Sequence, residues 1–140
     1  MSFDVQQLTD RYIAQWNEPN PATRAALVHE LWTSDAVHVL TNPPQAIRDA
    51  AASLALPAPP LEARGHAALE DRVGRAYEMF VEPGEHVFEA AGEAVLLMPQ
   101  VVGVRWSMRS TRTGEVVGGG LDVLTVDDDG RVCSDHQFIE

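Results

Sequence analysis

The apolar residues of this chain change their spacing once, and that change limits the folds it can adopt. Before Glu82, three stretches repeat apolar residues every three or four positions, as on one face of a helix. From His86 onward, apolar and polar residues alternate, and turn residues such as Asp129-Gly130 separate the runs. Helices gathered first and strands gathered last predict an α+β fold, with the helices on one face of an antiparallel sheet.

Three helices and one strand are expected in the first half of the chain. The helical stripes are Val5, Leu8, Tyr12 and Trp16; then, after a cap at Asn20, Leu27, Val28, Leu31 and Trp32; then, after Gly65, Leu69, Val73, Ala76, Tyr77 and Phe80. Residues 34–40, SDAVHVL, predict a strand. Residues 43–63 contain a proline-bracketed, alanine-rich stretch with a short helix expected over 46–55, and we interpret them as an insertion or flap.

The second half predicts a run of strands, over residues 86–91, 93–98, 102–109, 115–126 and 131–139. The glycines at 118–120 lie inside the fourth of these strands, where they predict a bulge or a sharp bend. A long sheet with such a bend curves around its contents. We therefore expect a cone-shaped barrel of a strongly curved sheet, packed against three helices and enclosing one apolar pocket.

Length, charge and cysteine content exclude several classes of protein. The 140 residues are expected to form a single domain. The net charge of −11 disfavours binding to nucleic acid or to an anionic membrane. Cys133 has no partner for an internal disulfide, and the chain contains neither a signal-peptide pattern nor an apolar run long enough to span a membrane. These features predict a cytoplasmic protein.

Three residues are candidates for catalysis. Asp122 shares a strand face with Leu124 and Val126, so a carboxyl group there would be desolvated and its pKa raised; alternatively, Asp122 faces outward and its neighbours form the core face. Tyr12 could hold a substrate oxygen, or it could be a core tyrosine bonded to a backbone carbonyl. His38 could be a general base, or a core histidine whose hydrogen bonds are satisfied.

A second group of residues is expected to contact a small apolar organic ligand. Its members are Trp16, Trp32, Leu40, Trp106, Met108, Leu124 and Gln137. Ordinary core packing of Trp106 and Met108 would give the same pattern, and the run 135–137 leaves open which of its polar residues faces a cavity. The histidines lack the spacing of a metal site, and no phosphate loop or nucleophile elbow is present, so no metal and no cofactor are expected.

Four segments of the chain, in their order and spacing, resemble the nuclear-transport-factor-2-like superfamily, in particular its SnoaL-like polyketide cyclase and ketosteroid isomerase branches. They are RYIAQWN (11–17), LWTSDAVHVL (31–40), RGHAAL (64–69) and GLDVLTVDDDGRV (120–132). The resemblance implies a cone-shaped α+β barrel, often a homodimer through the outer face of the sheet. It also implies that Tyr12 and Asp122 bind a substrate oxyanion. The isomerases have a carboxylate base just after the first strand, whereas this chain offers His38 in its place.

The leading hypothesis is an enzyme of isomerase, cyclase or lyase type without a cofactor. In it, His38 removes a proton next to a carbonyl group, and a protonated Asp122 and Tyr12 hold the enolate oxygen. The first alternative is a non-catalytic protein that binds or carries an apolar metabolite. A further alternative is a structural dimer whose cavity is filled by side chains.

Overall fold

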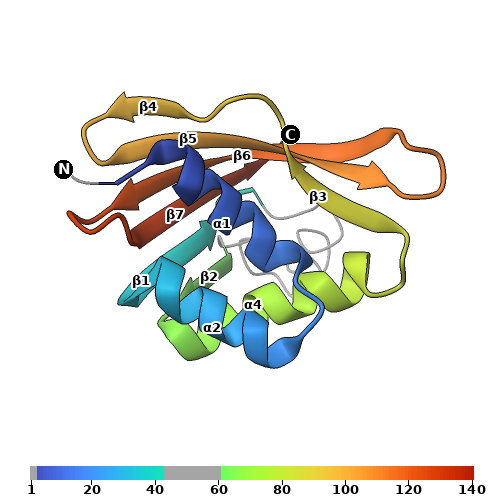
Figure 1. Ribbon diagram of the computed structural model, residues 1–140, viewed down its shortest axis with the longest axis horizontal. Coiled ribbons are helices and arrows are strands. Elements are labelled where there is room, and N and C mark those ends of the chain that lie inside the picture. The colour runs from blue at the N-terminus through green and yellow to red at the C-terminus, as the bar shows by residue number, and fades with distance from the viewer. Residues whose placement is uncertain (1–2, 43–60) are drawn as a thin grey trace, which may run out of the picture.

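The computed structural model describes residues 3–42 and 61–140, and within them it contains helices followed by strands. The helices are α1 (Val5–Asn17), α2 (Pro21–Leu31) and α4 (His66–Ala76), which continues into the single π-helical turn η1 (Tyr77–Val81). The strands are β1 (Trp32–Leu40), β2 (Leu61–Arg64), β3 (His86–Ala90), β4 (Val95–Met98), β5 (Val101–Ser110), β6 (Val116–Val126) and β7 (Val132–Ile139). The three helices lie on one face of the sheet (Figure 1), which confirms the α+β prediction.

The helices begin where their capping residues place them. The Asp4 side chain accepts a hydrogen bond from the Gln7 backbone N–H at 3.0 Å and starts α1. Asn20 caps α2 in the same way, with Pro21 at the first helical position. Gly65 precedes α4 with a φ of +85°, a conformation that glycine adopts without strain. These starts agree with the sequence prediction.

Within residues 3–42 and 61–140, the sheet has seven strands and is mixed rather than purely antiparallel. Its order is β2-β1-β7-β6-β5-β3, and β4 pairs with the first part of β5. All pairs are antiparallel except β1–β7, which is parallel. The prediction of an antiparallel sheet was wrong at this pair because turn residues indicate hairpins between consecutive strands, whereas β1 and β7 are far apart in the sequence. The sheet is open, since β2 and β3 are its two ends.

The glycines of β6 allow a tryptophan to lie flat on the strand. The β5–β6 register shifts between Met108 and Arg109, which leaves Val117 as an extra residue beside the glycine run. A Cβ atom on Gly120 would lie 2.7 Å from the indole of Trp106 and 2.6 Å from the carbonyl oxygen of Phe138. The predicted bulge is therefore present, and the glycine at 120 makes room for the indole.

Two sequence predictions need correction, and a third cannot be compared. Trp32 is the first residue of β1 and not part of a helix. It follows Val28 by four positions, a spacing that fits both a further helical turn and the first inward residue of a strand. The end of the predicted 43–63 flap belongs to the sheet, because Leu61–Arg64 form β2 and pair with β1. The helix expected over 46–55 lies outside the described residues.

The inner face of the sheet carries the even-numbered residues of β6. Asp122 and Leu124 are fully buried and Val126 nearly so, which confirms the inward parity predicted for Asp122. On other surfaces, apolar side chains are exposed along β4 and at Val116, Val117 and Phe138. The homodimer expected through the outer sheet face stays a prediction. None of the described helices combines the length and the hydropathy needed to cross a membrane.

Candidate active site

The candidate site lies on the inner face of the sheet, where two rows of paired residues cross β2, β1, β7, β6 and β5. The first row is Ala63, His38, Asp135, Leu124 and Val102, and the second is Leu61, Leu40, Gln137, Asp122 and Val104. Tyr12 reaches both rows from α1, which packs over this face (Figure 1). The fold thus brings together Tyr12, His38 and Asp122, the three residues predicted to be catalytic, and adds Asp135 to them.

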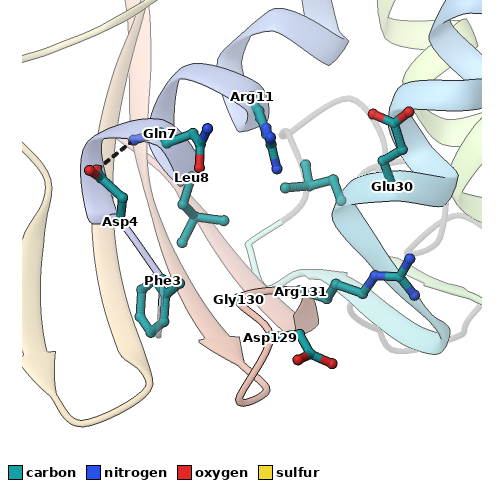
Figure 2. A pocket seen from close by; sticks show the side chains of 10 residues that line it. Phe3, Asp4, Gln7, Leu8, Arg11, Glu30, Asp129, Gly130 and Arg131 are labelled. Atoms are coloured by element: carbon teal, nitrogen blue, oxygen red, sulfur yellow. Dashed lines mark hydrogen bonds between the residues drawn. The ribbon is translucent and has the colours of Figure 1, made fainter. Parts of the chain in front are cut away.

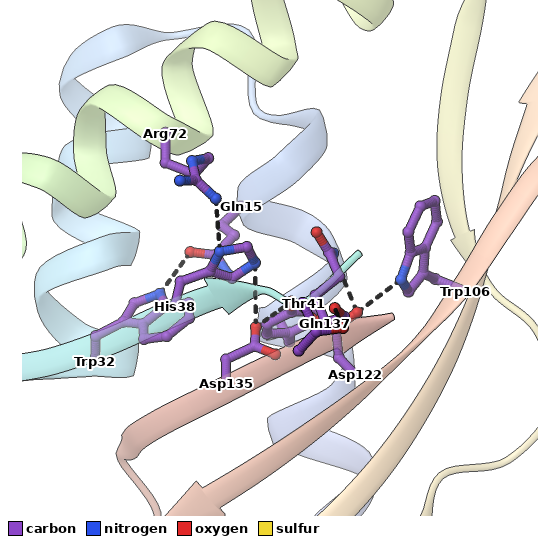
Figure 3. A network of polar contacts seen from close by, with 10 residues as sticks. Gln15, Trp32, His38, Thr41, Arg72, Trp106, Asp122, Asp135 and Gln137 are labelled. Atoms are coloured by element: carbon purple, nitrogen blue, oxygen red, sulfur yellow. Dashed lines mark hydrogen bonds and ion pairs between the residues drawn. The ribbon is translucent and has the colours of Figure 1, made fainter. Parts of the chain in front are cut away.

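Asp122 is surrounded by hydrogen-bond donors. Its Oδ1 accepts from Trp106 Nε1 at 2.7 Å and from Gln137 Nε2 at 3.1 Å, and its Oδ2 lies 2.6 Å from the Tyr12 hydroxyl (Figure 3). An indole nitrogen can only donate, so Asp122 Oδ1 must accept. These three contacts engage both oxygens of a fully buried carboxyl group, and the indole and amide N–H groups can only donate to it. The sequence hypothesis had placed a proton on this residue.

The Tyr12 oxygen has a second carboxyl group beside it, and the two contacts together require an extra proton. Asp135 Oδ2 lies 2.5 Å from the Tyr12 oxygen, on which only one hydrogen is available. Contacts as short as those to Asp122 and Asp135 each need a proton between the two oxygen atoms. Burial, followed by the charge of Asp122, raises the pKa of Asp135 well above its ordinary value. We therefore assign the extra proton to Asp135.

His38 is held in one tautomer by an arginine from α4. Arg72 Nη1 lies 2.9 Å from His38 Nδ1 (Figure 3), and because a guanidinium group can only donate, Nδ1 accepts. In the neutral imidazole, the hydrogen is therefore on Nε2. Burial, opposed in part by Asp122, lowers the pKa of His38 to about 4, so the ring is neutral at pH 7. His38 thus presents an N–H donor to the site, which argues against its predicted role as a base.

Two neighbouring residues of this network each contain a buried polar atom without a partner in the part of the chain that the structure describes. His38 Nε2 and Asp135 Oδ1 are buried without a hydrogen-bond partner among the described residues. The nearest approach is 3.7 Å, between His38 Nε2 and Asp135 Oδ2, which is too long for a hydrogen bond. Gln15 Nε2 is also unpaired, although Gln15 Oε1 accepts from Trp32 Nε1 at 2.9 Å. Buried unpaired groups are uncommon in folded proteins and are often functional.

His38, Asp122 and Asp135 are of the types that bind metals, and their ligating atoms lie within 4.8 Å of one another. A histidine that binds a metal must offer a lone pair to it and usually donates its other ring N–H to an acceptor. Here the donor Arg72 occupies Nδ1, which leaves an N–H on Nε2. The hydrogen bonding of His38 therefore fits a donor better than a metal ligand.

Aromatic rings surround the polar network. Trp16 lies 5.8 Å from the His38 ring, between ring centres, and Phe88 lies 5.7 Å from Trp106. The other predicted ligand residues are Trp32, 6.3 Å from the His38 ring; Leu40 and Gln137, in the row of Asp122; Leu124, in the row of Asp135; and Met108, against Gly118. Their contact with a ligand stays a prediction. Leu40, Trp106, Met108 and Gln137 are half-buried, whereas Tyr12, His38, Asp122 and Asp135 are buried.

The sequence hypothesis left out Asp135 and Arg72. A signal for Asp135 was available, because Asp135 and Gln137 are two positions apart in one strand and must face the same side of the sheet. Arg72 carried no comparable signal. Its position on the expected third helix is that of an ordinary solvated cation, and its contact with His38 depends on how α4 packs on β1.

A groove of about 670 Å³ lies on another part of the molecule. It opens between the start of α1, the end of α2 and the β6–β7 turn, and both apolar and charged side chains line it (Figure 2). Arg11, Glu30 and Arg131 are among its charged lining residues. None of the residues predicted to form the site lines the groove, and the apolar pocket expected beside Asp122 stays a prediction.

Sequence comparison and structure comparison give different results for this chain. No protein-family model matches the sequence, and no curated protein matches it. Among solved structures, a proposed isomerase of the SnoaL-like family from Agrobacterium tumefaciens is 20% identical with a TM-score of 0.75, and 97% of each chain is covered.

Two further solved structures show the same similarity. An NTF2-like protein of unknown function from Exiguobacterium is 16% identical with a TM-score of 0.63, covering 95% of this chain and 98% of the other. A proposed polyketide cyclase from Sinorhizobium meliloti is 14% identical with a TM-score of 0.61, covering 96% and 99%. At these identities the similarity concerns the fold. The predicted resemblance is confirmed at that level: this chain has the α+β fold of the SnoaL-like, NTF2-like proteins.

Proposed function

We propose that this protein is an enzyme of isomerase, cyclase or lyase type, which moves a proton next to a carbonyl group of a small apolar molecule without a cofactor. The observation that carries the proposal is that Asp135 Oδ2 and Asp122 Oδ2 both lie within hydrogen-bond distance of the Tyr12 oxygen, from which we infer one proton shared among the three groups. Two buried carboxyl groups that hold one proton between them provide an acid and a base at the same place. The solved structures of similar fold, proposed to be an isomerase and a polyketide cyclase, support the same class of chemistry.

The three groups form a relay. Asp135 Oδ1, which has no partner, takes a proton from the substrate carbon, while the hydrogen on Asp135 Oδ2 passes to the Tyr12 oxygen. The Tyr12 hydrogen moves at the same time to Asp122 Oδ2. The substrate becomes an enolate, and the charge of Asp122 is neutralised. The reverse sequence returns a proton to the same or another carbon, and the latter outcome is an isomerisation.

His38 is the group that we assign to the enolate oxygen. Its Nε2–H is buried, unpaired and fixed by the Arg72 contact, so it needs no reorganisation before it donates. A preorganised donor of this kind typically lowers a barrier by about 3 kcal/mol. The surrounding rings of Trp16, Phe88 and Trp106 supply apolar walls for the carbon skeleton of the substrate.

Deuterium exchange from heavy water tests this proposal without knowledge of the natural substrate. Apolar aryl ketones and β-diketones are incubated with the protein, and exchange next to the carbonyl group is followed by proton NMR. We expect exchange above the buffer rate, and a loss of about 100-fold or more in Asp135→Asn and in Tyr12→Phe. His136→Gln is the matched control, because His136 neighbours Asp135 in the chain but its side chain is exposed.

Two outcomes of the exchange experiment would contradict the proposal, and an infrared measurement tests it independently. Exchange at the wild-type rate in Asp135→Asn would remove Asp135 from the reaction. Infrared spectroscopy provides a check without substrate: the carbonyl stretch of a protonated carboxyl group must be present at pH 7 and absent in Asp135→Asn. If ketones bind at this site and never exchange, the protein instead binds or carries an apolar metabolite.

A further inference from the structure

Two histidines lie against each other on the helical side of the molecule, apart from the network around Asp122. His29 belongs to the last turn of α2 and His66 is the first residue of α4. Their ring centres are 4.1 Å apart, and the planes of the rings are inclined by 45°. The His29 side chain is 56% exposed, and His66 is half-buried, so solvent reaches the pair.

Each of these histidines has one ring nitrogen engaged by an acceptor. His66 Nε2 lies 2.8 Å from the carbonyl oxygen of Trp32, which can only accept, so Nε2 carries the hydrogen. His29 Nε2 lies 2.6 Å from Glu70 Oε1, and an ionised carboxylate also only accepts. In the neutral imidazoles, both lone pairs are therefore on Nδ1. Among the described residues, neither Nδ1 atom has a hydrogen-bond partner.

This arrangement matches the requirements of a metal ligand. A histidine that binds a metal through one nitrogen typically donates the N–H of the other to a carboxylate or a backbone carbonyl, which fixes the ring. Glu70 and the Trp32 carbonyl are acceptors of these two kinds. Nitrogens bound to one tetrahedral ion at about 2.0–2.1 Å are roughly 3.3 Å apart. The ring centres, 4.1 Å apart, must separate by about 1 Å to share such an ion, a change that rotation of the exposed His29 side chain can supply.

We propose that His29 and His66 together bind one divalent transition-metal ion of the kind that prefers imidazole, such as Cu²⁺ or Zn²⁺. The affinity order of these ions makes Cu²⁺ the more sensitive probe. Glu70 and the Trp32 carbonyl orient the two rings, and water completes the coordination. The site is independent of the reaction proposed at Asp135, because none of its side chains belongs to that network.

The test uses the full chain and Cu²⁺ alone. Electron paramagnetic resonance of the 1:1 mixture should show a type 2 copper signal with hyperfine splitting from two equivalent nitrogens. His29→Gln and His66→Gln should each lose the two-nitrogen pattern, and calorimetry should show weaker Cu²⁺ and Zn²⁺ binding. Glu70→Gln should keep both ligands and weaken binding by about tenfold, since it removes only the charged acceptor that orients His29.

His136→Gln is the control, because it removes an exposed histidine from β7 and leaves the pair intact. It should bind Cu²⁺ like the wild type. Circular dichroism verifies that the variants remain folded. The proposal is overturned if either His29→Gln or His66→Gln retains the two-nitrogen signal and the wild-type affinity, or if His136→Gln abolishes them.

Discussion

The neutral state of His38 makes a prediction about stability that needs no substrate. The variant is His38→Gln, whose side chain is polar and of similar length but cannot titrate. Its amide oxygen can accept from Arg72, and its amide nitrogen can replace the Nε2–H donor. Other titrating groups are common to the two proteins and cancel when their stabilities are subtracted.

The sign and size of the effect follow from the lowered pKa. Above pH 6.5, His38 is neutral in both the folded and the unfolded chain. Between pH 6.5 and about 4, the unfolded chain binds a proton that the folded chain does not, so the free energy of unfolding decreases as the pH falls. The whole change amounts to about 3 kcal/mol and is complete below the folded pKa of about 4.

Urea unfolding followed by tryptophan fluorescence, at half-unit steps from pH 3.5 to 7.5, measures this difference. We expect the stability of the wild type relative to His38→Gln to decrease by about 3 kcal/mol from pH 6.5 to 4 and then to stay level. Nitrogen-15 NMR of the wild type at pH 7 should show a single neutral tautomer with the hydrogen on Nε2. A stability difference that does not change with pH, or a hydrogen on Nδ1, would refute the assignment of His38 as a fixed donor.

Three other predictions concern stability, two on the same face of the sheet and one on α4. The pKa of Asp135 is higher in the folded chain than in the unfolded chain, so above the ordinary aspartate pKa the folded chain binds the extra proton. Raising the pH should therefore reduce the stability of the wild type relative to Asp135→Asn by about 1.4 kcal/mol per pH unit, until the raised pKa is reached. A stability difference, measured by urea unfolding, that stays constant with pH would contradict this. Gly120→Ala should lower the free energy of unfolding by about 1–3 kcal/mol, because the new Cβ would lie 2.6 Å from the Phe138 oxygen and 2.7 Å from the Trp106 indole. Gly74→Ala, in α4, should instead stabilise the chain by about 0.5–1 kcal/mol in the same urea assay, because the new Cβ would lie at an ordinary contact distance of 3.6 Å from Arg24 Nη1.

The sequence indicated positions better than it indicated charges. Alternation along β6 gave the inner face as one of two options for Asp122, and the helical spacing of α1 placed Tyr12 in the core, because both patterns depend on residues close in the chain. The parallel β1–β7 pair joins residues about a hundred positions apart, so nothing local indicated that His38 lies beside Asp135. The protonation states depend on such contacts: Arg72 determines the tautomer of His38, and Tyr12 links the two carboxyl groups.

The network has a charge at each end and one interruption in between, and this order indicates where a ligand acts. Hydrogen bonds run from the Arg72 cation to His38, and from Asp135 through Tyr12 to the Asp122 anion. The break in this series lies between His38 and Asp135, where Nε2 and Oδ2 are 3.7 Å apart, and each of the two residues has a buried atom without a partner among the described residues, His38 Nε2 and Asp135 Oδ1. A buried unpaired polar group typically costs about 1–3 kcal/mol, so the folded protein tolerates two such costs at one place. A ligand that accepts from His38 Nε2 and donates to Asp135 Oδ1 would satisfy both atoms, connect the two charges and lie where the proposed proton transfer begins.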